Sequence, residues 1–260
     1  MSVTVRTEPK RRLPIVVVLG MHRSGTSLCA HILSMLGLDM ADGVLPKSDA
    51  PKGHWERLEI VNTHDRILQF LDRDYYSPLH AHAFPPGWWA EPPVRVARNE
   101  LAAWLRQRIG DSPRFGFKDP RTCRMMPMWK EIFSDVGLEP RYVFCVRDPR
   151  QVGRSIADRD HLAYDDSEYR WMVYNAHAVV TVGEAPVCVV PYEAWFADPA
   201  PILARMAALT HAPMHPDDPE LKAAVADVID SNLRHDDPAA GIRLSQITRE
   251  FYAQLNGAAG

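Results

Sequence analysis

Two kinds of hydrophobic pattern alternate along this chain. Short apolar runs rich in β-branched and aromatic residues, typical of strands buried on both faces, cover residues 14–19, 115–118, 142–146 and 187–190. Apolar residues at helical spacing predict helices over residues 26–37, 57–73, 94–109, 125–136, 151–160, 167–182 and 200–210, and again from residue 219. Strands separated by helices predict an α/β fold of three layers, with a central parallel β-sheet flanked by helices.

The length of the chain predicts one domain. A chain of 260 residues fits a single large α/β domain, which we place at residues 13–260, behind a flexible tail at residues 1–12. Residues 74–93 form a long loop rich in proline and aromatic residues. Loops of this length are usually functional or disordered, so we expect a substrate-binding loop there.

The connection between the first strand and the first helix reads GMHRSGTS, at residues 20–27. A strand, a glycine-bounded loop and a helix together point backbone N–H groups and a helix N-terminus at one anion, which predicts a P-loop-like phosphate site. The lysine of the nucleoside-triphosphate motif G-x-x-x-x-G-K-[ST] is missing, because Thr26 stands at its position. The strong cation of this loop is Arg23 instead.

Cationic residues also follow the second and third predicted strands. In a parallel sheet the segments after the strands meet at one edge, so residues 20–27, 118–121, 147–155 and 192–193 are expected to converge. Arg147 has the forked geometry that binds a phosphate, and Ser155 follows it on the first turns of the next predicted helix. The chain therefore offers two anion sites, which suit a ligand with two separated anionic groups.

Composition excludes several classes of protein. A net charge of −3 implies no general attraction to nucleic acid, and no apolar run approaches the roughly 20 residues of a membrane span. None of the four cysteines is in a C-x-x-C pair, and three lie beside apolar neighbours in predicted strands or helices, as expected of reduced thiols in a cytoplasmic protein. The pairs His80/His82 and His211/His215 resemble metal ligands only superficially, since Pro213 spoils the helix of the second pair, so no metal is expected.

These motifs resemble those of the sulfotransferases that use 3′-phosphoadenosine 5′-phosphosulfate (PAPS). The 5′-phosphosulfate loop of that family, [KR]-S-G-T-[ST], is matched by residues 23–27, and its 3′-phosphate motif, R-x-P-x-x-V-x-x-S, by residues 147–155. The segments VVPYEAWFADP, at residues 189–199, and DSNLRH, at residues 230–235, also resemble family segments. The resemblance runs from about residue 14 to residue 235.

The resemblance implies roles for individual residues. The residues implied to bind the donor, PAPS, are Arg23, Ser24, Gly25, Thr26 and Ser27 on the 5′-phosphosulfate and Arg147 and Ser155 on the 3′-phosphate. Cytosolic members carry a late R-K-G element for the 3′-phosphate, which is missing here, and Arg234 is the candidate substitute. The product would be adenosine 3′,5′-bisphosphate, and no metal is required.

Sulfuryl transfer is expected to resemble phosphoryl transfer, with charge moving to the leaving oxygen, so positioned cations do most of the catalysis. The candidate cations are Arg23 and Lys118, and Lys118 matches a K-x-P element of glycan-modifying members. The acceptor hydroxyl also needs a general base, for which Glu56 is the first candidate and His54 the second. Glu56 is alternatively a first-turn helix acid, and Lys118 and Arg121 are alternatively solvated strand-end charges.

The predicted function is transfer of a sulfuryl group from PAPS to a hydroxyl of a carbohydrate or glycosylated metabolite, in a bacterial cytoplasmic enzyme. The alternative is a P-loop kinase-like phosphotransferase or a non-catalytic nucleotide-binding module, although a kinase needs the missing lysine and a magnesium ligand. Trp88 and Trp89 either stack on a sugar or cap the core. The sequence predicts neither the acceptor's identity nor the oligomeric state.

Overall fold

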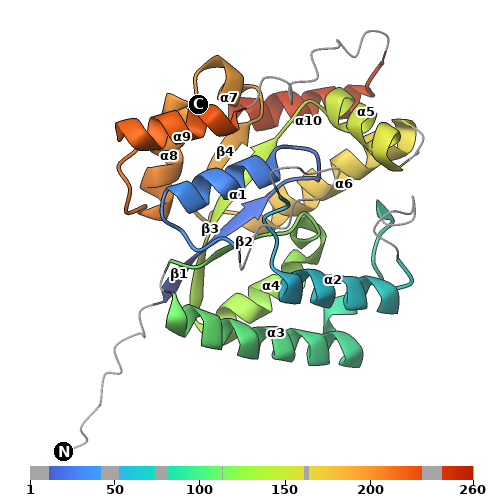
Figure 1. Cartoon of the computed structure of the whole chain (residues 1–260). Helices are drawn as coiled ribbons and strands as arrows, with labels where there is room; N and C mark the ends of the chain where they lie inside the picture. The colour runs from blue at the N-terminus through green and yellow to red at the C-terminus, as the bar shows by residue number, and fades with distance from the viewer. Residues whose placement is uncertain are drawn as a thin grey trace, which may run out of the picture.

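The computed structural model describes residues 12–41, 53–73, 81–112, 114–160, 164–229 and 242–259. Within these ranges the strands are β1 (Leu13–Leu19), β2 (Gly116–Lys118), β3 (Leu138–Val146) and β4 (Val187–Pro191). They form one sheet in the order β2-β1-β3-β4, and every neighbouring pair is parallel. The predicted central parallel sheet is confirmed (Figure 1).

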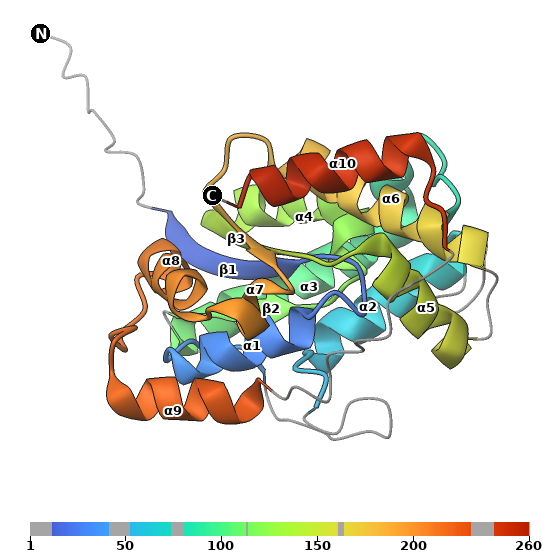
Figure 2. The same ribbon diagram turned by 90° about the horizontal axis from the view of Figure 1, so that it is seen from above.

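Helices cover both faces of this sheet. Their bounds are α1 (Thr26–Met35), α2 (Leu58–Phe70), η2 (Trp88–Ala90), α3 (Pro92–Asp111), α4 (Thr122–Val136), α5 (Pro149–Asp160), α6 (Tyr164–Val182), α7 (Ala194–Ala197), α8 (Ala200–Thr210), α9 (Pro219–Val228) and α10 (Gln246–Gly257). Figure 2 shows the sheet between α1 and α9 on one side and α4, α6 and α10 on the other. The chain therefore has the three-layer, P-loop-like fold that the pattern predicted. No described helix is both long and apolar enough to cross a bilayer.

The burial of β1 explains why its sequence is a continuous apolar run. Ile15, Val17 and Leu19 pack into one hydrophobic cluster, with residues of α2, α3, α4 and α6. Val16 and Val18 point to the opposite face and pack into a second cluster, with residues of α1, α8 and α9. A strand covered on both faces has no solvent side, so it shows no alternation of polar and apolar residues.

The strand order decides where the site lies. From β1 the chain passes to β2 on one side, and it then returns to β3 on the other side of β1. Ligands of open parallel sheets bind at the carboxyl ends of the strands where the chain changes direction in this way. The segments that follow β1, β2 and β3 are therefore neighbours, although β1 ends at Leu19, β2 at Lys118 and β3 at Val146.

The predicted elements differ from the structure mainly at their ends. Strand β3 begins at Leu138, four residues before the predicted start, and pairs there with Leu13 of β1. Residues 139–141 read Glu-Pro-Arg, which hid the start of the strand from a pattern of apolar residues. Of the predicted tail and the predicted substrate loop, residues 1–11 and 74–80 lie outside the described residues.

Candidate active site

The loop between β1 and α1 needs glycine at both ends. Gly20 has a φ of 133°, and a Cβ atom there would lie 2.6 Å from the carbonyl oxygen of Cys145. Gly25 has a φ of 84°, and a Cβ atom there would lie 2.6 Å from Cδ2 of Tyr192. Only a residue without a side chain fits both the backbone conformation and the space. The loop is thereby held against the ends of β3 and β4.

The same loop presents polar groups suited to an anion. Helix α1 begins at Thr26 with neither a side-chain N-cap nor an acidic residue in its first turn. Ser24 is 1% exposed, and its hydroxyl makes no hydrogen bond within the described residues. A buried hydroxyl without a partner costs roughly 1–3 kcal/mol, and a helix N-terminus attracts negative charge. A bound anionic group would satisfy both.

Arg147, directly after β3, is held against this loop from several sides. Its Nη1 donates to the carbonyl oxygen of Arg23 at 3.0 Å, and its Nε donates to Oε1 of Gln151 at 2.9 Å. The guanidinium carbon lies 4.1 Å from the centre of the Tyr192 ring, and Nε1 of Trp171 donates to the Arg147 carbonyl at 3.1 Å. Burial lowers the pKa of Arg147, a penalty that an adjacent anion would relieve.

Arg23 connects the two predicted anion sites. Its Nε donates to Oγ of Ser155 at 2.8 Å, across 132 positions of sequence. Its backbone has a positive φ of 69°, which is uncommon for a non-glycine residue. The resemblance assigns Arg23 to the 5′ end of the donor and Ser155 to the 3′ end, and the structure brings the two side chains into direct contact.

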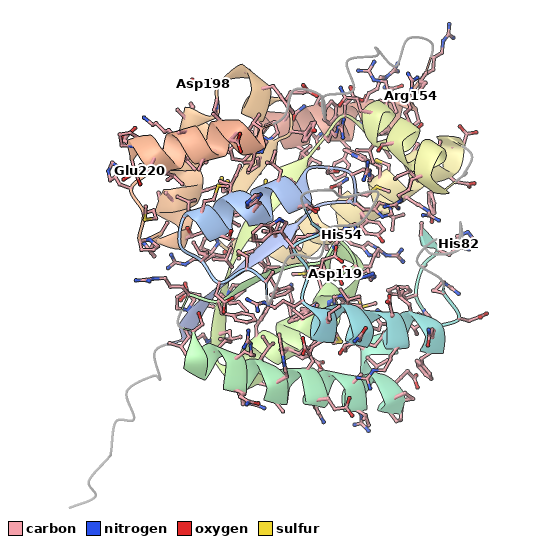
Figure 3. All side chains as sticks on the ribbon, in the orientation of Figure 1. His54, His82, Asp119, Arg154, Asp198 and Glu220 are labelled. Carbon is pink, nitrogen blue, oxygen red and sulfur yellow. The ribbon has the colours of Figure 1, made fainter. Side chains whose placement is uncertain are left out.

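The candidate catalytic residues of the segment before α2 lie near the same loop. Oγ of Ser27, on α1, donates to the backbone carbonyl of His54 at 3.1 Å. Two residues further on, Oε1 of Glu56 accepts from Nζ of Lys118 at 2.7 Å. Figure 3 labels His54 in the middle of the molecule, whereas Arg154 lies toward its periphery. The candidate base and the candidate cation are therefore an ion pair.

Comparison with known proteins agrees with this arrangement. A family model described as the sulfotransferase family matches residues 14–216. The chain belongs to the sulfotransferase family. As an enzyme of this family it is a transferase that moves a sulfuryl group.

Two solved structures are similar to this sulfotransferase in fold. The sulfotransferase domain from the Synechococcus PCC 7002 olefin synthase is 20% identical, with a TM-score of 0.53, over 97% of this chain and 96% of that one. The sulfotransferase domain from the curacin biosynthetic pathway is 15% identical, with a TM-score of 0.53, over 94% of this chain and 98% of that one. No curated protein sequence matches this chain.

A buried polar network behind Lys118 was not predicted from the sequence. The carboxylate of Asp119 is fully buried, accepts from Nη1 of Arg121 at 2.7 Å and lies 2.9 Å from Nδ1 of His64. Nε1 of Trp129 donates to Nε2 of His64 at 3.0 Å, so His64 is the neutral tautomer that donates through Nδ1. Both nitrogens of His64 are therefore occupied, Nδ1 by Asp119 and Nε2 by Trp129, and His64 has no nitrogen left for acid–base catalysis.

The charges of this network belong to the core rather than to the surface. Lys118 is 1% exposed and Arg121 is 8% exposed, so the alternative of solvated strand-end charges is wrong. Burial by itself would raise the pKa of Asp119, but Arg121 and His64 outweigh burial and lower that pKa below its ordinary range. The sequence signal for this network was the Lys-Asp-Pro-Arg segment of residues 118–121, which begins with the last residue of β2 and in which only the cations were weighed.

The remaining predicted residues have different outcomes. Arg234 lies outside the described residues, so its predicted role stays untested, and so does His80 of the pair that was not expected to bind a metal. Trp88 is 4% exposed and packs edge-on against Phe84 and Trp89, so of its two alternatives the core position is correct. Within the described ranges no group of three or more His, Cys, Asp or Glu side chains is arranged to hold a metal ion.

Proposed function

We propose that this sulfotransferase moves a sulfuryl group from PAPS to a hydroxyl of a carbohydrate or glycosylated small molecule. The observation that carries the proposal is the joining of the two motifs. Arg147 donates to the backbone of Arg23, and Arg23 donates to Ser155. A donor with a 5′-phosphosulfate and a 3′-phosphate on one ribose needs two adjacent anion sites of this kind.

The donor fits the groups that surround these sites. Ser24, Gly25, Thr26 and Ser27 would bind the 5′-phosphosulfate through the helix N-terminus and the buried Ser24 hydroxyl. Arg147 would bind the 3′-phosphate, as the resemblance implies. Its Nη2 makes no hydrogen bond within the described part of the chain, so one edge of the guanidinium is available to a phosphate oxygen.

Catalysis would then depend on charges that are already positioned. In the transfer, the acceptor oxygen bonds to sulfur while the bridging oxygen leaves with the 5′-phosphate, and the acceptor proton passes to Glu56. Arg23 lies on the donor side, where charge develops on the leaving oxygen. Lys118 holds the Glu56 carboxylate at 2.7 Å and places a positive charge beside the acceptor.

Glu56 is favoured over His54 as the base, because its carboxylate is placed beside Lys118. The His54 carbonyl accepts from Ser27, whereas Glu56 contributes the carboxylate that meets Lys118. A carboxylate that carries a fixed hydrogen bond on one oxygen keeps the other oxygen for the acceptor. Glu56 therefore remains the first candidate.

The acceptor class rests on fewer observations. Trp89 is partly exposed in the aromatic loop and can stack on a sugar ring. The similar domains named above belong to an olefin synthase and to the curacin biosynthetic pathway, and neither is named for a carbohydrate. An acceptor screen with radiolabelled donor, spanning glycosides and aliphatic alcohols, distinguishes these classes. A cytoplasmic location is also proposed, and the four free, buried cysteines support it.

Donor identity is tested by thermal unfolding with adenosine 3′,5′-bisphosphate or with ATP and magnesium. A ligand at a hundred times its Kd stabilises the folded state by about 2.7 kcal/mol, which shifts the Tm measurably. We expect the bisphosphate to raise the Tm and ATP with magnesium to have little effect. Preferential stabilisation by ATP would favour the kinase alternative and overturn the proposal.

A further inference from the structure

The irregular segment of residues 53–57, which leads into α2, contacts α1, β2 and the loop after α1. Its His54 carbonyl accepts from Ser27 on α1, as described above. Its Trp55 ring stacks on the ring of His31, with centroids 4.3 Å apart. Its last residue, Arg57, reaches β2 and the loop after α1. Glu56 lies between Trp55 and Arg57, the residues that make the last two of these contacts.

Arg57 makes an unusually complete set of contacts for a cation. Its side chain is fully buried, and its Nε donates to the carbonyl of Gly116 at 3.1 Å. Its Nη2 donates to the carbonyl oxygen of Asp39 at 2.6 Å and to Oδ1 of the same residue at 2.7 Å. The guanidinium carbon lies 4.1 Å from the centre of the Phe115 ring. A planar guanidinium can donate to these three acceptors at once, whereas the single ammonium group of lysine cannot reproduce this geometry.

These contacts fix the segment against the strand that carries Lys118. Arg57 bonds to the carbonyl of Gly116, at one end of β2, and Glu56 bonds to Lys118, at the other end. Two consecutive residues are thus joined to the two ends of one three-residue strand. A slip by one residue would move the carboxylate by about 3.3 Å, which exceeds the reach of its hydrogen bond to Lys118.

The backbone of the segment indicates that this placement is imposed rather than intrinsic. Trp55 has a φ of 56°, a conformation that bulky residues adopt only when their surroundings require it. The backbone strain at Trp55 is offset by the stacking on His31 and by the hydrogen bonds of His54 and Arg57 on either side. The segment is therefore held in one position at a conformational cost, directly beside the candidate base.

We propose that Arg57 is a positioning residue for catalysis, which holds Glu56 in register with Lys118 through its fork on Gly116 and Asp39. This inference rests on the proposed function, because it takes Glu56 to be the base. As a fully buried positioning residue, Arg57 would itself touch neither donor nor acceptor. Its removal is expected to lower kcat and to leave donor binding unchanged, because the donor sites are built from α1, α5 and the end of β3.

The test compares Arg57→Lys in two backgrounds, the natural chain and Glu56→Gln. Turnover is measured as radiolabelled sulfate released from PAPS to water, which needs no other acceptor, and with any acceptor that the screen identifies. Donor affinity is measured by titration with adenosine 3′,5′-bisphosphate. We expect Arg57→Lys to lower kcat about 10- to 100-fold in the natural chain, to change donor affinity less than about twofold, and to lower kcat no further in Glu56→Gln.

Two control variants separate positioning from stability. Asp39→Asn keeps the size of the side chain but weakens the bond from Arg57 to Oδ1, and it is expected to lower kcat by a smaller factor, about three- to tenfold. Ile60→Val, in the buried face of α2, removes a methyl group without touching the fork and is expected to lower the Tm while kcat is retained. If Ile60→Val lowers kcat as much as Arg57→Lys, the effect is one of stability and the inference is overturned.

The remaining outcomes decide between this inference and the proposed function. Equal losses of kcat from Arg57→Lys in both backgrounds would overturn the positioning role and leave sulfuryl transfer intact. A Glu56→Gln variant with normal turnover would remove the group that Arg57 is proposed to position, again without affecting the donor. Failure of the natural chain to bind the bisphosphate would overturn the proposed function, and this inference with it.

Discussion

Replacing Arg147 by alanine is the most direct test of the donor site. The substitution removes the guanidinium edge at Nη2 that is available to a 3′-phosphate, together with the bonds to the Arg23 carbonyl and to Gln151. A hydrogen bond to a charged group contributes roughly 1.5–3 kcal/mol, so the loss of one or two such bonds weakens binding by about 3 kcal/mol. That loss corresponds to a Kd about 100-fold higher for adenosine 3′,5′-bisphosphate.

The assay compares two ligands that differ only at the 3′ position. Kd is measured by calorimetry for adenosine 3′,5′-bisphosphate and for adenosine 5′-phosphate, with the natural chain, Arg147→Ala and Arg147→Lys. We expect the preference for the bisphosphate to disappear in Arg147→Ala and to return partly in Arg147→Lys, which keeps a point charge but not the fork. Arg95→Ala, at an exposed position on α3, is the matched control and is expected to bind both ligands normally.

The result that refutes this reasoning is an equal loss of affinity for both ligands in Arg147→Ala. Such a loss would mean that Arg147 supports the loop through the Arg23 carbonyl and does not recognise the 3′-phosphate. Unchanged affinity for both ligands would remove Arg147 from the site altogether.

Three further substitutions test separate parts of the site. Gly25→Ala places a Cβ atom 2.6 Å from the Tyr192 ring at a positive φ, so we expect a lower Tm and a loss of bisphosphate binding, and a normal Tm would contradict the turn geometry. Glu56→Gln is expected to lower turnover at least 100-fold while bisphosphate binding persists, and near-normal turnover would remove Glu56 as the base. Asp119→Asn removes the buried negative charge beside Arg121 and His64 and leaves Arg121 its ion pair with Asp65, so we expect the free energy of unfolding to fall by about 3 kcal/mol in urea titrations. Because the folded pKa of Asp119 lies below its ordinary value of 3.8, its stabilising contribution is complete above that pH and is lost on further acidification. The free energy of unfolding of the variant should therefore fall less steeply below about pH 4 than that of the natural chain. An equally steep fall would contradict the stabilising role of the Asp119 carboxylate.

Much of the fold follows from local pattern. The continuous apolar run of residues 14–19 required a strand covered on both faces, and the glycine-bounded loop with a following helix required an anion site after it. These features depend on side-chain spacing and on backbone conformations that only glycine tolerates. Both are properties of residues close together in the sequence, so the sequence alone predicts them. The start of β3 was missed because a Glu-Pro-Arg stretch carries no apolar signal, although pairing with β1 holds it in the sheet.

The partners within the site were decided by the tertiary structure. The sequence alone placed Arg23 and Ser155 in separate motifs, and only the position of β3 beside β1 brings them to 2.8 Å. It likewise gave no partner for Arg57, whose acceptors lie on β2 and in the loop after α1. The physical reason is that residue spacing determines on which face of its own helix or strand a side chain lies. The order of the strands in the sheet determines which other helices and strands lie next to that face.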